Sequence, residues 1–173
     1  MALVNEYIAK LKSTVNPNRF RAKINFPSFL ESNDASDLSE FMIQSTSVPS
    51  VDIGVIEIPI HGGEKLKVAG DKTYADWTAT LICDVDFVLY KNFMKWSEYL
   101  KSTIAGTKAA DFTYKVAIEL TQLDGANQPI QTWSLIGAFP ISIGELTMST
   151  EDTDSYSTFD VTLSYDFMVT NLT

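Results

Sequence analysis

Few side chains in this sequence could carry out covalent chemistry. His61 is the only histidine and Cys83 the only cysteine. A catalytic pair would need the two close together, but Cys83 falls in an apolar strand segment and His61 in a glycine-rich turn. No set of His, Cys and carboxylate residues has the spacing of a zinc site, and no Gly-x-Ser-x-Gly elbow occurs. The sequence therefore predicts no enzyme, no metal site and no cofactor.

Three other segments resemble binding sites but fit other roles better. The segment Gly70-Asp71-Lys72-Thr73 resembles a phosphate loop, but Asp71 stands where the lysine should follow the glycine, and its carboxylate would repel phosphate. Asp84 or Asp86 suits the N-cap of the following helix. The acidic run 151–154 reads as a solvated loop, because a calcium loop needs more regular oxygen ligands and a glycine at a fixed place.

The composition is that of one globular domain. The chain has 173 residues, of which 45% are hydrophobic and 20% charged. Residues 116–173 contain eight acids and no Lys or Arg, and the net charge is −9, so tight binding to nucleic acid is not predicted. A membrane helix would need about 20 apolar residues in a row, which the sequence lacks. The N-terminus has no signal-peptide core, and we expect the protein to stay in the cytoplasm where it is made or to leave by cell lysis.

Hydrophobic periodicity predicts a mainly β fold, an antiparallel barrel or sandwich with one packed helix. We expect a single domain over 1–173, with a short N-terminal helix at 2–12, a main helix at about 86–104 and a tail at 168–173. Expected strands lie at about 19–26, 40–47, 74–84, 112–120, 131–136, 145–149 and 158–167. Residues 27–39 read as a polar loop, after which 40–47 should pair back as a long hairpin. Two prolines make residues 50–63 an excursion or an edge.

Two blocks of residues are distinctive. The first runs from Val68 to Thr78, and the second holds a Gly-x-x-Pro turn, an Ile-Gly-Glu-Leu strand start and a closing alternating strand. Together they resemble the tail tube proteins of contractile-tailed phages. The likeness spans about 17–167 and departs from the family in the length of 27–39 and in the tail after 167. The motif residues are Ala69, Gly70, Asp71, Trp77, Pro140, Gly144 and Glu145.

The resemblance implies a β-barrel-like subunit that forms hexameric rings. Such rings stack into a hollow tube inside a contractile sheath, and DNA passes down the lumen during ejection. The implied partners are other copies of the chain, the sheath, the baseplate hub or tube initiator, the tail terminator, the tape-measure protein and phage DNA. The implied location is the virion, with assembly in the host cytoplasm and membrane contact only at ejection.

Two sets of residues are candidates for contacts within such a tube. A polar strand face is the candidate lumen surface, although an ordinary solvated outer face would show the same alternation; it comprises Thr158, Asp160, Thr162, Ser164 and Asp166. Loops at 27–39 and 48–72 are candidate ring-to-ring contacts, represented by Ser32, Asn33, Asp34, Asp37, His61, Gly62, Gly63 and Asp71. Asp71 also reads as a plain turn carboxylate, and Trp77 as a core indole.

Other functions remain open at this point. The nearest is the tube of a related machine, such as a phage-tail-like bacteriocin, an extracellular injection system or a type VI secretion tube. A ligand-binding barrel of lipocalin type is a different class, and it would need an apolar cavity inside the barrel.

Overall fold

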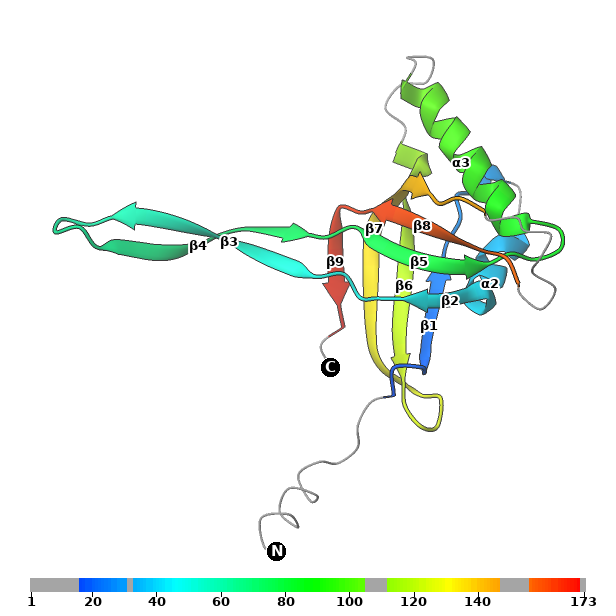
Figure 1. Ribbon diagram of the computed structural model, residues 1–173, viewed down its shortest axis with the longest axis horizontal. Helices are drawn as coiled ribbons and strands as arrows, with labels where there is room; N and C mark the ends of the chain where they lie inside the picture. Colours follow the sequence, from blue (N-terminus) through cyan, green and yellow to red (C-terminus); the bar gives the residue numbers. More distant parts are fainter. Residues whose placement is uncertain (1–15, 31–32, 105–111, 147–155, 172–173) are drawn as a thin grey trace, which may run out of the picture.

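A computed structural model describes residues 16–30, 33–104, 112–146 and 156–171 (Figure 1). The helix expected at 2–12 and the acidic run at 151–154 lie outside these residues. The described chain forms a body of strands and helices from which one long β-hairpin projects (Figure 1).

Seven strands of the body form one antiparallel sheet, as the mainly β prediction required. Their order is β1-β6-β7-β8-β5-β2, and β9 also pairs with β7. The bounds are β1 Phe20–Ile24, β2 Ile43–Thr46, β5 Trp77–Ile82, β6 Val116–Leu123, β7 Pro129–Ile143, β8 Thr158–Ser164 and β9 Phe167–Thr170. Strand β7 is 15 residues long, so its first half pairs with β6 and β9 and its second half with β8. The sheet thereby folds into two layers that share β7.

The core lies between the two layers, where the apolar faces of the strands meet. Alternate residues along β5 and β8 are buried, as the period of two predicted. The largest fully buried side chains are Trp77, Trp96, Phe93, Phe159, Ile24, Leu81, Leu89, Ile118, Leu135, Leu163 and Val161. The prediction that the Trp77 indole lies in the core is therefore confirmed.

The main helix, α3 (Val88–Ile104), packs its aromatic stripe on this core. The backbone N–H of Val88 donates to Oδ1 of Asp84 at 3.0 Å, so Asp84 caps the helix and Asp86 does not. Phe93 lies edge-on to Phe159, with ring centroids 6.2 Å apart, and the Trp96 indole N–H donates to the Tyr114 carbonyl at 3.0 Å. These contacts hold the helix against β8 and η2.

The prediction of a polar loop at 27–39 is wrong. This segment forms a short 3-10 helix, η1 (Ser28–Leu30), and then α2 (Asn33–Met42). Ala35 and Ser39 are fully buried, and the Ser39 hydroxyl accepts a hydrogen bond from the Ile24 N–H at 3.1 Å. The prediction that 40–47 pairs back on the preceding strand is also wrong. Because α2 carries the chain to the other layer, β2 pairs with β5 and not with β1.

The C-terminal part also differs from expectation in its strand limits. Phe112–Tyr114 is a 3-10 helix, η2, and β6 starts only at Val116. The chain bends after β8, and the expected tail forms β9, which pairs with the first half of β7. Phe167, which ends the strand expected at 158–167, is 47% exposed because it follows this bend. Glu145 and Leu146 form no strand, and 147–149 lie outside the described residues.

The projecting hairpin, called the arm here, consists of β3 (Val51–Pro59) and β4 (Lys65–Tyr74). Among the described strands these two pair only with each other, as expected for an excursion from the sheet. At the tip the Ile60 N–H donates to the Glu64 carbonyl at 2.9 Å, and Gly62 and Gly63 have φ angles of 114° and 88°. Glycine suits these positions because other residues rarely adopt such angles.

Candidate assembly surfaces

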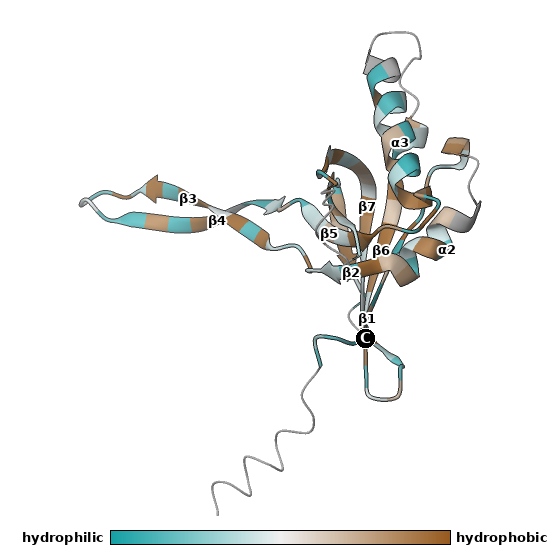
Figure 2. Ribbon diagram, turned by 45° about the vertical axis from the view of Figure 1, so that its right-hand side comes forward, coloured by the Kyte–Doolittle hydropathy of each residue, from teal (hydrophilic) through white to brown (hydrophobic). Residues whose placement is uncertain are grey.

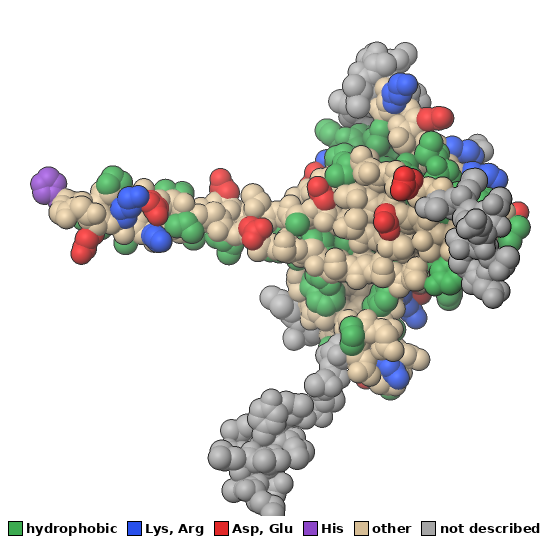
Figure 3. Space-filling view, viewed as in Figure 1, with side chains coloured by type: hydrophobic (Ala, Val, Ile, Leu, Met, Phe, Trp, Pro, Cys, Tyr) green, Lys and Arg blue, Asp and Glu red, His purple; other side chains and the backbone are tan. Residues whose placement is uncertain are grey.

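The layer β7-β8-β5-β2 presents a polar face on the side away from the core. The sequence placed Thr158, Asp160, Thr162 and Ser164 on one face of a strand, and β8 does alternate these residues with buried ones. Asp160 accepts a hydrogen bond from the Thr80 hydroxyl at 2.7 Å. The shallow hollow around Asp160 is lined by Ser45, Thr46, Ser47, Thr78, Ala79 and Thr80. In Figure 3 the centre of this side of the body is mostly neither hydrophobic nor charged, with scattered acidic side chains.

Asp166, the fifth lumen candidate, has a different setting from this row. It lies beyond the end of β8, and both its carboxylate oxygens accept hydrogen bonds from Lys115, at 2.7 and 2.8 Å. Its backbone N–H donates to the Ile136 carbonyl at 3.0 Å. Asp166 therefore ties the bend after β8 to β7 and to Lys115, which lies between η2 and β6, and its negative charge is paired.

The same layer is open at both of its edges. Among the described residues β2 pairs only with β5, and the segment Phe139–Ile143 of β7 pairs only with β8. Each edge thus leaves backbone donors and acceptors without a neighbouring strand. Exposed edges of this kind invite pairing with another chain.

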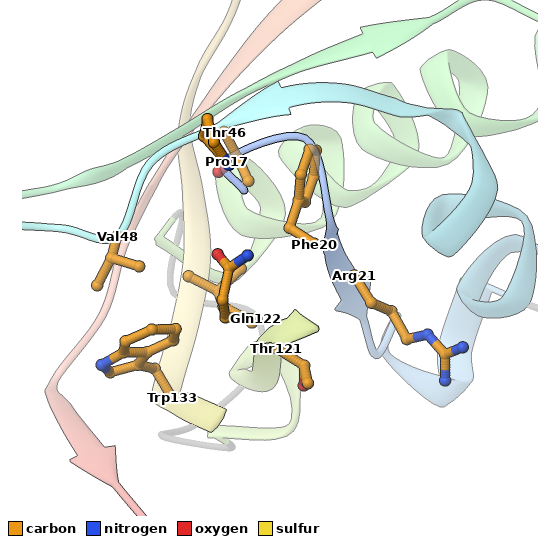
Figure 4. Close-up of a pocket in the computed structure, with 9 residues that line it drawn as sticks. Pro17, Phe20, Arg21, Thr46, Val48, Thr121, Gln122 and Trp133 are labelled. Atoms are coloured by element: carbon orange, nitrogen blue, oxygen red, sulfur yellow. The ribbon is translucent and has the colours of Figure 1, made fainter. Parts of the chain in front are cut away.

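A further opening lies between the two end strands of the sheet, β1 and β2. Figure 4 shows Thr46 and Val48, on and just after β2, across a small pocket from Phe20 and Trp133 of the other layer. The pocket holds about 190 Å³ and is open to solvent. The interior of the fold is filled by side chains such as Trp77 and Phe93, so the cavity that a lipocalin-type barrel would need is occupied by the core.

The arm carries a row of exposed aliphatic side chains on one face. Ile56 pairs with Val68 and Ile58 with Leu66 across the hairpin, and directly opposed residues share a face. We call these four residues the aliphatic stripe; they are 41–55% exposed. Figure 2 shows the alternation of hydrophobic and hydrophilic residues along the arm.

The opposite end of the body also exposes large apolar side chains. Phe41 lies in the last turn of α2 just before β2, Val85 follows β5, and Tyr156 precedes β8. The strand registers bring these three points to one end, and the Gln44 amide donates to the Tyr156 hydroxyl at 3.0 Å. We call Phe41, Val85 and Tyr156 the end patch. The arm leaves from the other end of the same strands (Figure 1).

The candidate ring-to-ring residues therefore fall into two groups. His61, Gly62 and Gly63 form the tip of the arm, and Asp71 is exposed on β4. Asp37 belongs to α2, at the far end of the body, where it accepts a hydrogen bond from Lys23 at 2.7 Å; this bond raises the pKa of Lys23. Asn33 and Asp34 begin α2, and Ser32 lies outside the described residues.

The motif residues differ in their surroundings. Gly144 donates its N–H to the Asp160 carbonyl at 2.6 Å, and a Cβ there would lie only 2.9 Å from that oxygen. Pro140 is buried in β7 at an irregular step of the β7–β8 pairing, where its missing N–H is tolerated. Glu145 and Ala69 are exposed. Gly70 lies within the arm, packed against Gly54.

Sequence reasoning missed the aliphatic stripe and the end patch. The stripe had a usable signal, since residues 56–58 and 65–68 alternate in hydrophobicity on either side of the His61-Gly62-Gly63 turn, which is a hairpin pattern. The end patch had no such signal, because Phe41, Val85 and Tyr156 meet only through the strand pairing.

No binding chemistry of another kind emerges from the described residues. Within them, no three His, Cys, Asp or Glu side chains gather as a metal site would require. Burial raises the pKa of the Cys83 thiol, which makes it a poor nucleophile at neutral pH. Across the described ranges, no helix has the length and apolar character needed to cross a membrane.

The fold recurs in solved structures. The described chain shares its fold with chains in structures of contractile injection systems. One is a sheath–tube complex of an extracellular contractile injection system in the extended state, with a TM-score of 0.63, 16% identity and coverage of 94% of this chain and 96% of the other. Another is the tube-terminating cap of the anti-feeding prophage, with a TM-score of 0.64, 14% identity and coverage of 92% and 91%.

Sequence similarity then identifies the family. The model of the phage tail tube protein family matches residues 14–171, and the chain belongs to this family. It is 30% identical to the tail tube protein of Serratia phage KSP90, over 95% of each chain. It is also 30% identical to tail tube protein gp19 of Enterobacteria phage T4, over 87% of this chain and 88% of that protein. The protein is thus a structural component of a contractile phage tail and not an enzyme.

Proposed function

We propose that this chain, as a single domain, forms hexameric rings that stack into the inner tube of a contractile tail, through which the genome leaves. The observation that supports this most is the pair of open edges on the β7-β8-β5-β2 layer. If β2 of one copy lies beside Phe139–Ile143 of the next, the layers join into one continuous barrel. Closing a sheet in this way removes its exposed edges.

In this arrangement the polar face of the layer lines the channel. Thr158, Thr162 and Ser164 offer hydroxyl groups, and Asp160 adds negative charge. Such a wall attracts a DNA polyanion weakly, since tight DNA binding depends on Lys and Arg contacts to phosphate. Asp166 keeps its place as a lumen candidate, but its pairing with Lys115 gives it less influence on passing DNA.

Stacking follows from the placement of the two ring-to-ring groups at opposite ends of the subunit. The arm with His61, Gly62 and Gly63 points away from one end, and α2 with Asn33, Asp34 and Asp37 lies at the other. Contacts between unlike ends of identical subunits repeat in one direction and build a filament. Ser32 and Asp71 are proposed to act in the same contacts.

The proposed partners follow the order of parts along a tail. Solved structures of similar fold include a tube with its sheath, a tube cap and a baseplate. For this chain we propose contacts with the sheath outside, the baseplate hub below, the terminator above, and the tape-measure protein and DNA inside. Assembly takes place in the host cytoplasm, and the tube meets a membrane only at ejection. The alternative of a related injection machine is less favoured, because the relatives of 30% identity are phage tail tubes.

Negative-stain electron microscopy of the concentrated, purified protein tests this proposal. We expect hollow tubes, or single rings with six-fold symmetry. Particles that stay monomeric by light scattering and show neither rings nor tubes, even with tube-initiator proteins from the same phage added, would contradict it.

A further inference from the structure

The small pocket between β1 and β2 opens beside the free edge of β2, and we call it the edge pocket. Its apolar lining consists of Phe20, Leu120 and Trp133 from the other layer and of Val48, which follows β2 (Figure 4). The pocket holds about 190 Å³. An apolar cavity of about 150 Å³ takes a molecule the size of benzene, so the edge pocket has room for one aliphatic side chain.

The polar side chains around the edge pocket already have partners within the subunit. The Thr46 hydroxyl donates to a backbone carbonyl of β5 at 3.0 Å. The Gln122 amide donates to two backbone carbonyls just before β1, at 3.0 and 2.6 Å, and Arg21 forms an ion pair with Glu40 at 2.8 Å. Because these groups are engaged, an apolar occupant suits the pocket better than a polar one.

The opposite edge of the same layer carries an exposed aliphatic side chain. The β7–β8 register shifts between Pro140 and Ser142, so Ile141 is the extra residue of a bulge. Its side chain is 50% exposed, whereas Pro140 is buried and Ile143 packs partly against the core. Bulges at sheet edges redirect a side chain. Ile141 is therefore available for a contact outside its own subunit.

The edge pocket and the exposed isoleucine lie at the same level along the strands. Continuing the β2–β5 register by two residues brings Val48 level with Trp77. Trp77 pairs with Leu163 of β8, and Leu163 pairs with Pro140, the residue before Ile141. The two features thus occupy opposite edges of one layer, with matching positions along its strands.

The strand directions also suit a contact between these two edges. Neighbouring strands of the layer β7-β8-β5-β2 are antiparallel, so β2 runs opposite to β7. Rotation about a channel axis keeps each strand's direction relative to that axis, so β2 of one copy meets β7 of the next in antiparallel fashion. The joined edges continue the order of the layer.

We infer that Ile141 of one subunit inserts into the edge pocket of the next subunit in the same ring, against Val48 and Trp133. This inference rests on the proposed function, because it requires rings closed through these edges. It adds the side chain and the pocket that set the register of the two edges. A slip by one residue would turn the inserted side chain to the other face of the sheet.

A charge at position 141 tests the contact. Ile141→Asp should leave the circular dichroism spectrum of the subunit unchanged, because the side chain is half exposed. It should raise the protein concentration needed for ring formation by about tenfold or more, since the pocket loses an aliphatic group and faces a carboxylate. Analytical ultracentrifugation measures this concentration.

Ile130→Asp is the matched control for this variant. Ile130 is 46% exposed and lies on the first half of β7, away from the edge that faces β2 of the next copy. The control should form rings at the wild-type concentration. Rings from Ile141→Asp at that same concentration, or an equal loss in both variants, would overturn the inference.

Cross-linking in assembled tubes tests the position of the side chain. In a Cys83→Ser background, protein with Ile141→Cys is mixed with protein carrying Val48→Cys, assembled, and treated with a short bismaleimide. We expect a covalent dimer that forms only in the mixture. Replacing Ile141→Cys with Ile130→Cys should give none. Equal cross-linking from both positions, or none from Ile141→Cys, would overturn the inference.

These outcomes separate the inference from the proposed function. Wild-type protein that forms rings, while Ile141→Asp does so equally well and the cross-link to Val48→Cys is absent, upholds the ring proposal and overturns this contact. Wild-type protein that forms no rings or tubes under any condition, including added initiator proteins, overturns both.

Discussion

At the scale of single residues, the surroundings of the bend between β8 and β9 require a glycine at position 137. Gly137 has a φ of 76°, and the space where its Cβ would stand is filled by the Asp166 carboxylate. Lys115 holds that carboxylate and lies 5.9 Å from the ring centre of Phe139. The glycine, the ion pair and the bend therefore depend on one another.

We predict that Gly137→Ala destabilises the subunit by about 2 kcal/mol or more, because alanine must adopt a left-handed φ and displace a paired carboxylate. Chemical denaturation of the unassembled subunit measures this loss. Gly125→Ala, with open space around it, should cost far less. The double variant Gly137→Ala with Asp166→Ala should recover part of the loss, and a cost that stays the same would show that the carboxylate is not the obstacle.

At the scale of elements, the periodic strands and the main helix could be predicted from the sequence, because their burial patterns are local. The alternation along 158–164 and the stripe of Leu89, Phe93 and Trp96 are each read from one segment. Segment α2 could not be read in this way. Its polar composition resembles a loop, and its helical burial rests on Ala35 and on Ser39, whose hydroxyl bonds to β1.

The candidate contact surfaces were predicted only in part, for a related reason. The lumen row lies within one strand, and its alternation is visible in the sequence. The end patch combines α2, the turn after β5 and the start of β8, so it exists only after the strands have paired. Asp166 was placed in the lumen row because the alternation continues through the bend, which no local pattern marks.

The cap of α3 gives a prediction at this scale. Asp84→Ala should lower the free energy of unfolding by about 1 kcal/mol, because the Val88 N–H loses its acceptor. Asp86→Ala is the matched control and should cost little, since the Lys91 contact at that position goes to the backbone carbonyl. Thermal denaturation of both variants measures the difference, and equal losses would contradict the assignment of Asp84 as the cap.

At the scale of the whole molecule, the charge on the wall of the proposed channel should affect the passage of DNA. Asp160→Lys should slow DNA release from tails assembled with the variant, because an ammonium group on the lumen wall would contact phosphates in every ring. The rate of DNA release in vitro measures this effect. Glu119→Lys makes the same charge change on the exposed side of β6, away from the proposed lumen, and should leave the rate unchanged. Equal rates for the two variants would show that Asp160 does not face the DNA.

The central claim is that the open edges of one layer close the ring. A cryo-electron microscopy reconstruction of the assembled tube tests it most directly, because it resolves which strands of adjacent subunits lie side by side. We predict that β2 of one subunit lies beside Phe139–Ile143 of its neighbour, with Thr158, Asp160 and Thr162 facing the channel. A reconstruction in which these two edges are far apart, or in which β8 turns its polar face outward, would contradict the account.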